Sequence, residues 1–268
     1  MKNRVLIIAG SDCGGGAGVQ ADIKTVTALG GYAMSAITAI TVQNTLGVTA
    51  IHPIPEDIVR AQIEAVVSDL GADVWKIGML GSVALTRAVA RAYRGLGSGA
   101  PLVLDPVMIA KGGAALLEAD AVEVLRDELL PLAALITPNA PEAEALTGVS
   151  VTDAAGQAKA AARLLALGAR AALVKGGHIA GETIHDVLVD ADGVETFSSA
   201  RIDTRATHGT GCTLASAIAT GLAQGRTLKD AIVRARAYLR GAIVHAPGLG
   251  AGHGPLGHGW TADLTKLT

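Results

Sequence analysis

The sequence predicts a three-layer α/β protein in which helices cover both faces of a mainly parallel central sheet. Short apolar runs without polar alternation recur along the 268 residues, as expected for strands that are buried on both faces. Helical patterns lie between these runs, and that alternation favours strand–helix–strand units with parallel pairing. A late pair of alternating segments adds a hairpin, so the sheet is expected to be mainly and not wholly parallel.

The expected elements follow one another from the first residues onward. Buried strands are expected at 5–9, 36–42, 74–77, 102–104, 135–137 and 171–174, with helices at 18–29, 56–69, 83–94, 118–129, 141–147 and 154–167. Residues 186–198 are expected to form a hairpin around Asp192-Gly193, and two helices follow at 212–223 and 228–244. No repeat or linker interrupts this order, which predicts a single domain over residues 1–268. The Gly- and His-rich tail, about 247–268, is expected to be loosely ordered.

Composition excludes several classes of function. A net charge of -2 gives no electrostatic basis for binding nucleic acid or an anionic membrane. The first apolar run stops at Gly10, which is too early for a signal peptide or a membrane span. Cys13 and Cys212 are too few for a disulfide framework, so a reducing cytoplasm is the expected setting.

Polar or glycine-rich clusters follow nearly every expected strand. Because ligands bind at the carboxyl ends of parallel strands, these clusters predict a single rim that carries the site. The clusters are Gly10-Ser11-Asp12, Gln43-Asn44-Thr45, Gly78-Met79, Asp105-Pro106, Pro138-Asn139 and Lys175-Gly176-Gly177-His178.

The segment His208-Gly209-Thr210-Gly211-Cys212-Thr213 is the most informative part of the chain. Its glycines allow the backbone N–H groups to converge, and the helix that follows adds its free amides and its positive dipole end. This pattern predicts a seat for an anion, such as a phosphoryl group in transfer. Cys212 stands where a thiolate is favoured, although free cysteines are more often buried and inert.

Five further polar residues are candidates for ligand binding. The planar amide of Gln43 matches the edge of an aminopyrimidine. Asp105, Asn139 and Glu142 form an oxygen-rich set that suits Mg²⁺ bound to phosphate, and Asn139 and Glu142 also fit a helix capping box. Lys175, at a strand end before two glycines, is a candidate phosphate partner.

The glycines at 14–18 raise the alternative of a dinucleotide-binding loop. Their spacing has no clean register, and Gln43 stands where an acidic residue would be needed. We therefore favour close approach of the backbone to a small substrate. His178, His185 and His208 match no zinc spacing.

Taken together, the quoted motifs resemble the hydroxymethylpyrimidine/phosphomethylpyrimidine kinases of thiamine biosynthesis. The resemblance also includes Gly15-Gly16-Ala17-Gly18-Val19-Gln20-Ala21-Asp22, Lys76-Ile77-Gly78-Met79-Leu80 and Asp105-Pro106-Val107-Met108, and it is collinear over about residues 4–245. It implies a ribokinase-like fold, ATP and Mg²⁺ as cofactors, a homodimer, and two successive phosphorylations of 4-amino-5-hydroxymethyl-2-methylpyrimidine.

The resemblance also assigns roles to residues. It makes Gln43 the pyrimidine reader, with Met79, Val107, Gly10 and Ala17 around the ring and Asp22 near the reactive end. It makes Gly209, Thr210, Gly211 and Cys212 the anion hole, with Cys212 as candidate base and Lys175 as a phosphate contact. Asp105, Asn139 and Glu142 fall in the nucleotide–metal region, and residues 108–113, with Lys111, match a mobile flap.

The chain departs from the family at Cys13, where relatives carry proline, and this puts substrate affinity in question. A pyridoxal kinase on the same fold is the nearest alternative, although pyridoxal lacks the amino group that Gln43 would read. A sugar kinase would carry aspartate at the position of Cys212. A non-catalytic pyrimidine sensor would not need Lys175 or the anion-binding glycines.

Overall fold

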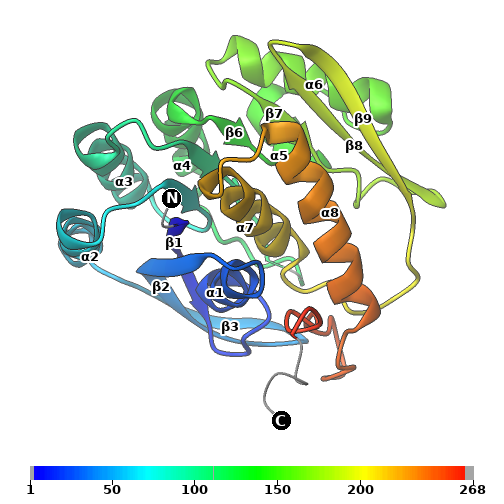
Figure 1. Ribbon diagram of the computed structural model, residues 1–268, viewed down its shortest axis with the longest axis horizontal. Coiled ribbons are helices and arrows are strands. Elements are labelled where there is room, and N and C mark those ends of the chain that lie inside the picture. The colour runs from blue at the N-terminus through cyan, green and yellow to red at the C-terminus, as the bar shows by residue number, and fades with distance from the viewer. Residues whose placement is uncertain (1–2, 111, 263–268) are drawn as a thin grey trace.

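The computed structural model describes residues 3–110 and 112–262. Among these residues, nine strands form one mixed sheet in the order β3-β2-β1-β4-β5-β6-β7-β8-β9 (Figure 1). Neighbours from β2 through β7 pair in parallel, whereas β3, β8 and β9 join the two ends in antiparallel fashion. The strands are β1 Arg4–Asp12, β2 Tyr32–Asn44, β3 Gly47–Pro53, β4 Val74–Ile77, β5 Leu102–Leu104, β6 Leu135–Ile136, β7 Ala172–Val174, β8 Thr183–Asp190 and β9 Gly193–Ala200.

Helices cover both faces of this sheet, as the alternation of β1 side chains requires. Leu6 and Ile8 belong to one core cluster, and Val5 and Ile7 belong to a second on the opposite face. The first cluster includes residues of α2, α3, α5 and α6, and the second includes residues of α1, α7 and α8 (Figure 1). Their bounds are α1 Gly18–Ala28, α2 Glu56–Asp69, α3 Val83–Leu96, α4 Ala119–Val124, α5 Ala140–Thr147, α6 Ala154–Ala166, α7 Thr210–Ala223 and α8 Leu228–Val244.

Strand β3 was not expected from the sequence. This strand lies at the edge of the sheet, and most of its side chains are half-buried or exposed. Its pairing with β2 shifts register between Val42 and Gln43. An edge strand needs no continuous apolar run, so the pattern used to find buried strands could not reveal it.

The helix expected at 118–129 is interrupted. It begins as α4, continues as a π-helix at Leu125–Leu129, and ends in a 3-10 turn at Leu130–Leu132. Pro131 lies inside this last turn and has no N–H to continue an α-helix. The apolar periodicity indicated a helix here but carried no signal for the change in winding.

The tail differs from the loosely ordered segment expected at 247–268. His258 is 4% exposed; its Nε2 lies 2.9 Å from Thr213 Oγ1, and its carbonyl accepts a 2.7 Å hydrogen bond from Tyr238. Residues 263–268 lie outside the described part of the chain. No helix in the described ranges is long and apolar enough to cross a membrane.

Candidate active site

A cavity of about 620 Å³ opens at the carboxyl ends of the parallel strands. The loops after β1, β4, β5, β6 and β7 all contribute to it, so the rim expected from the sequence is present. All but one of the predicted site residues line this cavity: Gly10, Ala17, Gln43, Met79, Asp105, Val107, Asn139, Glu142, Lys175, Gly209, Thr210, Gly211 and Cys212. Asp22 is the exception.

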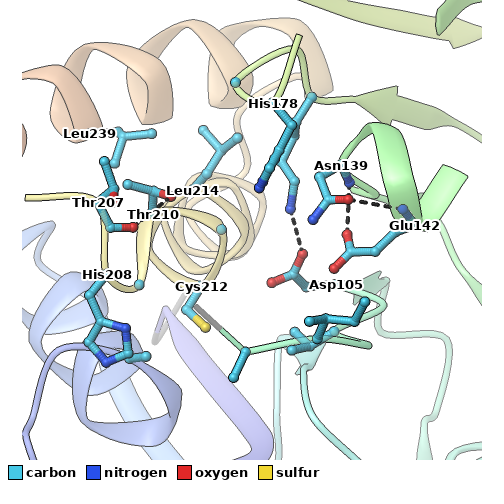
Figure 2. A pocket seen from close by; sticks show the side chains of 18 of the residues that line it. Asp105, Asn139, Glu142, His178, Thr207, His208, Thr210, Cys212, Leu214 and Leu239 are labelled. Atoms are coloured by element: carbon cyan, nitrogen blue, oxygen red, sulfur yellow. Dashed lines mark hydrogen bonds and ion pairs between the residues drawn. The ribbon is translucent and has the colours of Figure 1, made fainter. Parts of the chain in front are cut away.

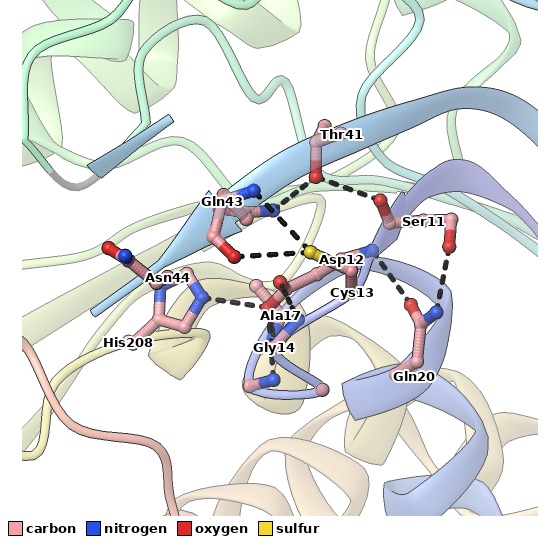
Figure 3. Close-up of polar contacts among 12 residues, drawn as sticks. Ser11, Asp12, Cys13, Gly14, Ala17, Gln20, Thr41, Gln43, Asn44 and His208 are labelled. Atoms are coloured by element: carbon pink, nitrogen blue, oxygen red, sulfur yellow. Dashed lines mark hydrogen bonds and ion pairs between the residues drawn. The ribbon is translucent and has the colours of Figure 1, made fainter. Parts of the chain in front are cut away.

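One end of the cavity is shaped by backbone and neutral side chains. We call it the acceptor end, formed by Gly10, Ala17, Gln43, Met79 and Val107. The Gln43 Nε2 donates a 2.7 Å hydrogen bond to Thr41 Oγ1 (Figure 3). A side chain at Gly10 would place its Cβ 3.0 Å from the Met79 sulfur, so the lack of a side chain at Gly10 preserves the width of this end.

Cys13 is exposed and does not line the cavity. Its Sγ donates to the Gln43 carbonyl at 3.1 Å and accepts from the Gln43 N–H at 3.4 Å. The Cys13 thiol therefore supports the backbone of Gln43 at the irregular β2–β3 register (Figure 3).

The predicted anion seat forms at the start of α7. Gly209 is the N-cap and has a left-handed φ of 80°, which glycine adopts without strain. The first amides of α7 follow at Thr210, Gly211 and Cys212, where a helix has no internal acceptors for them. A Cβ on Gly211 would lie 3.1 Å from Lys175 Nζ and 3.5 Å from Asp105 Oδ2. This gap in the side-chain lining fits an anionic group held between the helix and the lysine.

The opposite end of the cavity is charged. We call it the donor end, formed by Asp105, Asn139, Glu142 and Lys175. Lys175 Nζ donates to Asp105 Oδ1 at 2.9 Å, and Thr137 Oγ1 donates to the same oxygen at 3.1 Å. Burial opposes the charge on Lys175, but the Asp105 and Glu142 carboxylates raise its pKa above the ordinary value. Lys175 therefore stays cationic in a largely buried position.

Asn139 and Glu142 form the capping box that the sequence allowed. Asn139 Oδ1 accepts from the Glu142 N–H at 2.9 Å, and Glu142 Oε2 accepts from the Asn139 N–H at 2.8 Å (Figure 2). Burial raises the pKa of Glu142 to about 7, with Lys175 opposing this and Asp105 adding to it. The described residues contain no cluster of three or more His, Cys, Asp or Glu side chains that could hold a metal. Any Mg²⁺ here would therefore take few protein ligands and rely on phosphate and water.

Cys212 lies between the two ends, with Asp105, Asn139 and Glu142 on one side of it and His208 on the other (Figure 2). Burial raises the pKa of its thiol to about 12, although Lys76 and the Gly18 N–H favour the thiolate. Sequence reasoning left the direction of this shift open. The structure gives a thiol that keeps its proton at neutral pH.

The placement of Asp22 does not agree with the expected contact to substrate. Its side chain is fully buried, and Oδ2 accepts a 2.8 Å hydrogen bond from Lys76. Oδ1 accepts a 2.7 Å bond from Ser216 on α7. Asp22 faces the interior on α1 because it neutralises Lys76, which is also fully buried.

Two features of the lining were missed from the sequence. The first is the pairing of Asp12 with His208, both of which belong to segments that the sequence singled out: they lie 2.8 Å apart and join the loops after β1 and before α7, although 196 positions separate them. The second is the end of the cavity beside β8 and α8, which is lined by Arg236 and Arg240 and by the apolar residues Ile184, Ile202, Leu239 and Ile243. Their signal was an ordinary apolar pattern, which predicted only core packing. Of the expected flap, residues 108–110 and 112–113 line the cavity, and Lys111 lies outside the described residues.

A glycine-lined anion seat, a buried lysine and an open cavity on a doubly covered α/β sheet define a small-molecule kinase of the ribokinase-like type. The same class is found among solved structures. The pyridoxal kinase of Bacillus subtilis, solved as an ADP complex, superposes with a TM-score of 0.89 at 36% identity, covering 96% of this chain and 98% of that one.

The chain belongs to the phosphomethylpyrimidine kinase family, whose sequence model matches residues 12–257. The hydroxymethylpyrimidine/phosphomethylpyrimidine kinase of Streptomyces coelicolor is 49% identical over 96% of this chain and 94% of its own length. The thiamine biosynthesis bifunctional protein of Geobacter sulfurreducens is 52% identical over 96% of this chain, which spans 52% of that longer protein.

Proposed function

We propose that the protein phosphorylates 4-amino-5-hydroxymethyl-2-methylpyrimidine with ATP and then phosphorylates the resulting monophosphate. One observation carries this proposal. The Gln43 amide and the anion seat at Gly209–Cys212 face the same cavity, so an aminopyrimidine ring and a phosphoryl group can be held at once. Membership of the family supports the same activity.

The acceptor end selects the pyrimidine. Gln43 donates one amide hydrogen to Thr41 Oγ1. Its second amide hydrogen and its carbonyl oxygen are left for the ring edge. Met79 and Val107 then pack against the ring, and Gly10 and Ala17 allow it to approach the backbone. Pyridoxal lacks an amino group beside a ring nitrogen and would leave the Gln43 amide incompletely paired.

The donor end orients the phosphates of Mg-ATP. Asp105, Asn139 and Glu142 would face the magnesium, and Lys175 would hold the phosphate chain. ATP supplies the phosphoryl group, and Mg²⁺ offsets its charge when both are bound. Amides of Gly209, Thr210 and Gly211 stabilise the oxygens of the phosphoryl group as charge shifts during transfer. The end of the cavity beside α8 would take the adenine, with Leu239 and Ile243 against the ring.

Cys212 acts by hydrogen bonding and shape in this scheme. A thiol whose pKa is about 12 cannot accept a proton at neutral pH, and a loose transition state needs little activation of the attacking oxygen. We expect Cys212→Ala to slow both phosphorylations by a similar factor, roughly tenfold, and Cys212→Ser to recover part of the loss. Single-turnover rates for each step measure this. Selective loss of the first step by 100-fold or more would identify a base.

A homodimer is supported by exposed apolar side chains on β2, β3 and the turn between them. These side chains are Ile40, Val42, Leu46 and Ile51. The two free cysteines support a cytoplasmic setting. Size-exclusion chromatography with light scattering tests the dimer.

A mass-spectrometric time course with Mg-ATP tests the main proposal. We expect a monophosphate of the pyrimidine, followed by its diphosphate. A parallel reaction with pyridoxal is the control, and efficient phosphorylation of pyridoxal alone would assign the chain to that chemistry instead. Ligand binding without turnover would identify a sensor.

A further inference from the structure

Two loops that are distant in the sequence meet in close contact beside the cavity. We call residues 13–18 the glycine loop and residues 207–212 the anion loop. A Cβ on Gly209 would lie 1.8 Å from the Gly16 carbonyl oxygen, and a Cβ on Gly16 would lie 2.5 Å from the His208 ring. A side chain at Gly209 would overlap the Gly16 backbone, and one at Gly16 would displace the His208 ring. The absence of side chains at these glycines therefore lets the two loops approach closely enough for His208 to reach the glycine loop.

Asp12 holds both loops through one buried carboxylate. It is 1% exposed, and Oδ2 accepts from the N–H groups of Gly16 at 2.9 Å and Ala17 at 2.8 Å. Oδ1 accepts from Gly14 at 2.8 Å. His208 Nε2 lies 2.8 Å from Oδ2 and adds the bond to the other loop (Figure 3).

The charge state of Asp12 fixes the role of the histidine. Burial disfavours the ionised form, but the bonds from His208 and the loop amides lower the pKa of Asp12 below its usual value. An ionised carboxylate only accepts hydrogen bonds, so the His208 Nε2 must carry the hydrogen. The Oδ2 atom already accepts three bonds, which leaves it no capacity to bind a metal or to act as a base.

The tail supports this contact from outside. The His208 N–H donates to the Gly254 carbonyl at 3.1 Å, and the Gly254 N–H donates to Arg205 at 3.1 Å. Pro255 forms a parallel bridge with His208 and lies 3.2 Å from the Cβ position of Gly16. Three segments that are far apart in the sequence are thus locked around one carboxylate.

We propose that Asp12 and His208 are positioning residues that fix the acceptor alcohol relative to the phosphoryl group. This inference rests on the proposed function. The glycine loop contains Ala17, which lines the acceptor end. The anion loop contains the amides that would hold the phosphoryl group. In-line transfer requires the reacting atoms to be about 3–3.5 Å apart, and a misplacement of about 1 Å can cost on the order of 100-fold in rate.

The test compares His208→Ala, His208→Gln and Asp12→Asn with the wild-type protein. Glutamine can still donate a hydrogen bond to Asp12 but has no imidazole chemistry. The control is His52→Ala on β3, because His52 is exposed and outside the cavity lining. We would measure kcat, both KM values and the melting temperature of each protein. We would also measure hydrolysis of ATP without the pyrimidine, and hydrogen exchange of the Gly16 and Ala17 amides.

We expect His208→Ala to lower kcat for pyrimidine phosphorylation on the order of 100-fold, with KM for Mg-ATP unchanged. Hydrogen exchange of the Gly16 and Ala17 amides should accelerate, whereas hydrolysis of ATP should persist. The His208→Gln variant should recover part of the lost kcat. Asp12→Asn should resemble His208→Ala.

Three outcomes would overturn the positioning role of Asp12 and His208. They are a kcat within about threefold of wild type, a higher pyrimidine KM with kcat intact, and a folded His208→Gln protein as slow as His208→Ala. If the wild-type protein phosphorylates no pyrimidine, the proposed function fails instead. The exchange rates would still report whether the two loops are held together.

Discussion

The two ends of the cavity differ in the charge of the residues that line them. At the donor end, Asp105, Glu142 and Lys175 are ionisable, buried or nearly so, and electrostatically coupled. At the acceptor end, Gln43, Met79 and Val107 are neutral, and Gly10 and Ala17 bring the backbone close to the cavity. Under the proposed function, we expect charge to govern the rate of transfer, and shape with neutral hydrogen bonding to govern the choice of acceptor. Substitutions at the two ends should therefore affect different kinetic constants.

The largest effect is expected from Lys175→Met at the donor end. Removing this cation takes away stabilisation of the transferring phosphoryl group, and we expect kcat to fall on the order of 1000-fold. Melting temperature must be followed as well, because Asp105 loses its ion-pair partner. Lys229→Met is the matched control, since Lys229 pairs with Glu195 at the surface. A loss below tenfold in a folded variant would remove the contrast between the two ends.

A buried ion pair outside the cavity separates the effect of charge on folding from its effect on transfer. Lys76→Met would leave Asp22 unpaired in the core, and we expect unfolding free energy to fall by about 3–5 kcal/mol. Urea denaturation measures this. The double variant Lys76→Met with Asp22→Leu should recover much of the loss, because no uncompensated charge remains. A single variant as stable as wild type would mean that the pair contributes little.

At the acceptor end, Gln43→Leu should change affinity for the ring. Loss of its hydrogen bonds predicts a rise in pyrimidine KM of roughly 5- to 100-fold, with KM for Mg-ATP unchanged. Asn44→Ala is the neighbouring control, because that side chain is exposed and lies outside the lining. An equal rise in both KM values would show that the two ends are not separable.

The last prediction concerns the pH dependence of stability. The pKa of Glu142 is raised to about 7 from 4.5, so its stabilising contribution is complete below about 4.5 and is lost as pH rises through about 7. Glu142→Gln should remove this decline, which melting temperatures between pH 4.5 and 8 would detect. Glu144→Gln, on the same helix, is the control and should keep the decline. Parallel curves for wild type and Glu142→Gln would contradict the assignment.

The elements that could be predicted from the sequence are those defined by a pattern within their own residues. The runs at β4 and α2 were placed with their observed ends, because an apolar strand or an amphipathic helix is defined by its own residues. Strand β3 was missed because an exposed edge lacks such a pattern. The packed tail could not be predicted, because His258 contacts Thr213 and Tyr238, which lie far along the chain.

The site divides in the same way. Residues at strand ends, such as Gln43 and Lys175, could be placed on the rim because topology alone brings them together. The partner of Asp22 could not be found, since Lys76 is 54 positions away and its burial is visible only in the folded protein. The pairing of Asp12 with His208 was missed for the same reason.

The junction between the glycine loop and the anion loop has a consequence for protein synthesis. Asp12 emerges from the ribosome long before His208, which is 196 residues later, a delay of roughly 10–40 s at ordinary elongation rates. Throughout that interval the nascent chain contains the glycine loop but not the anion loop that packs against it. The order of translation therefore means that the active centre can be assembled only after residue 208 has been synthesised.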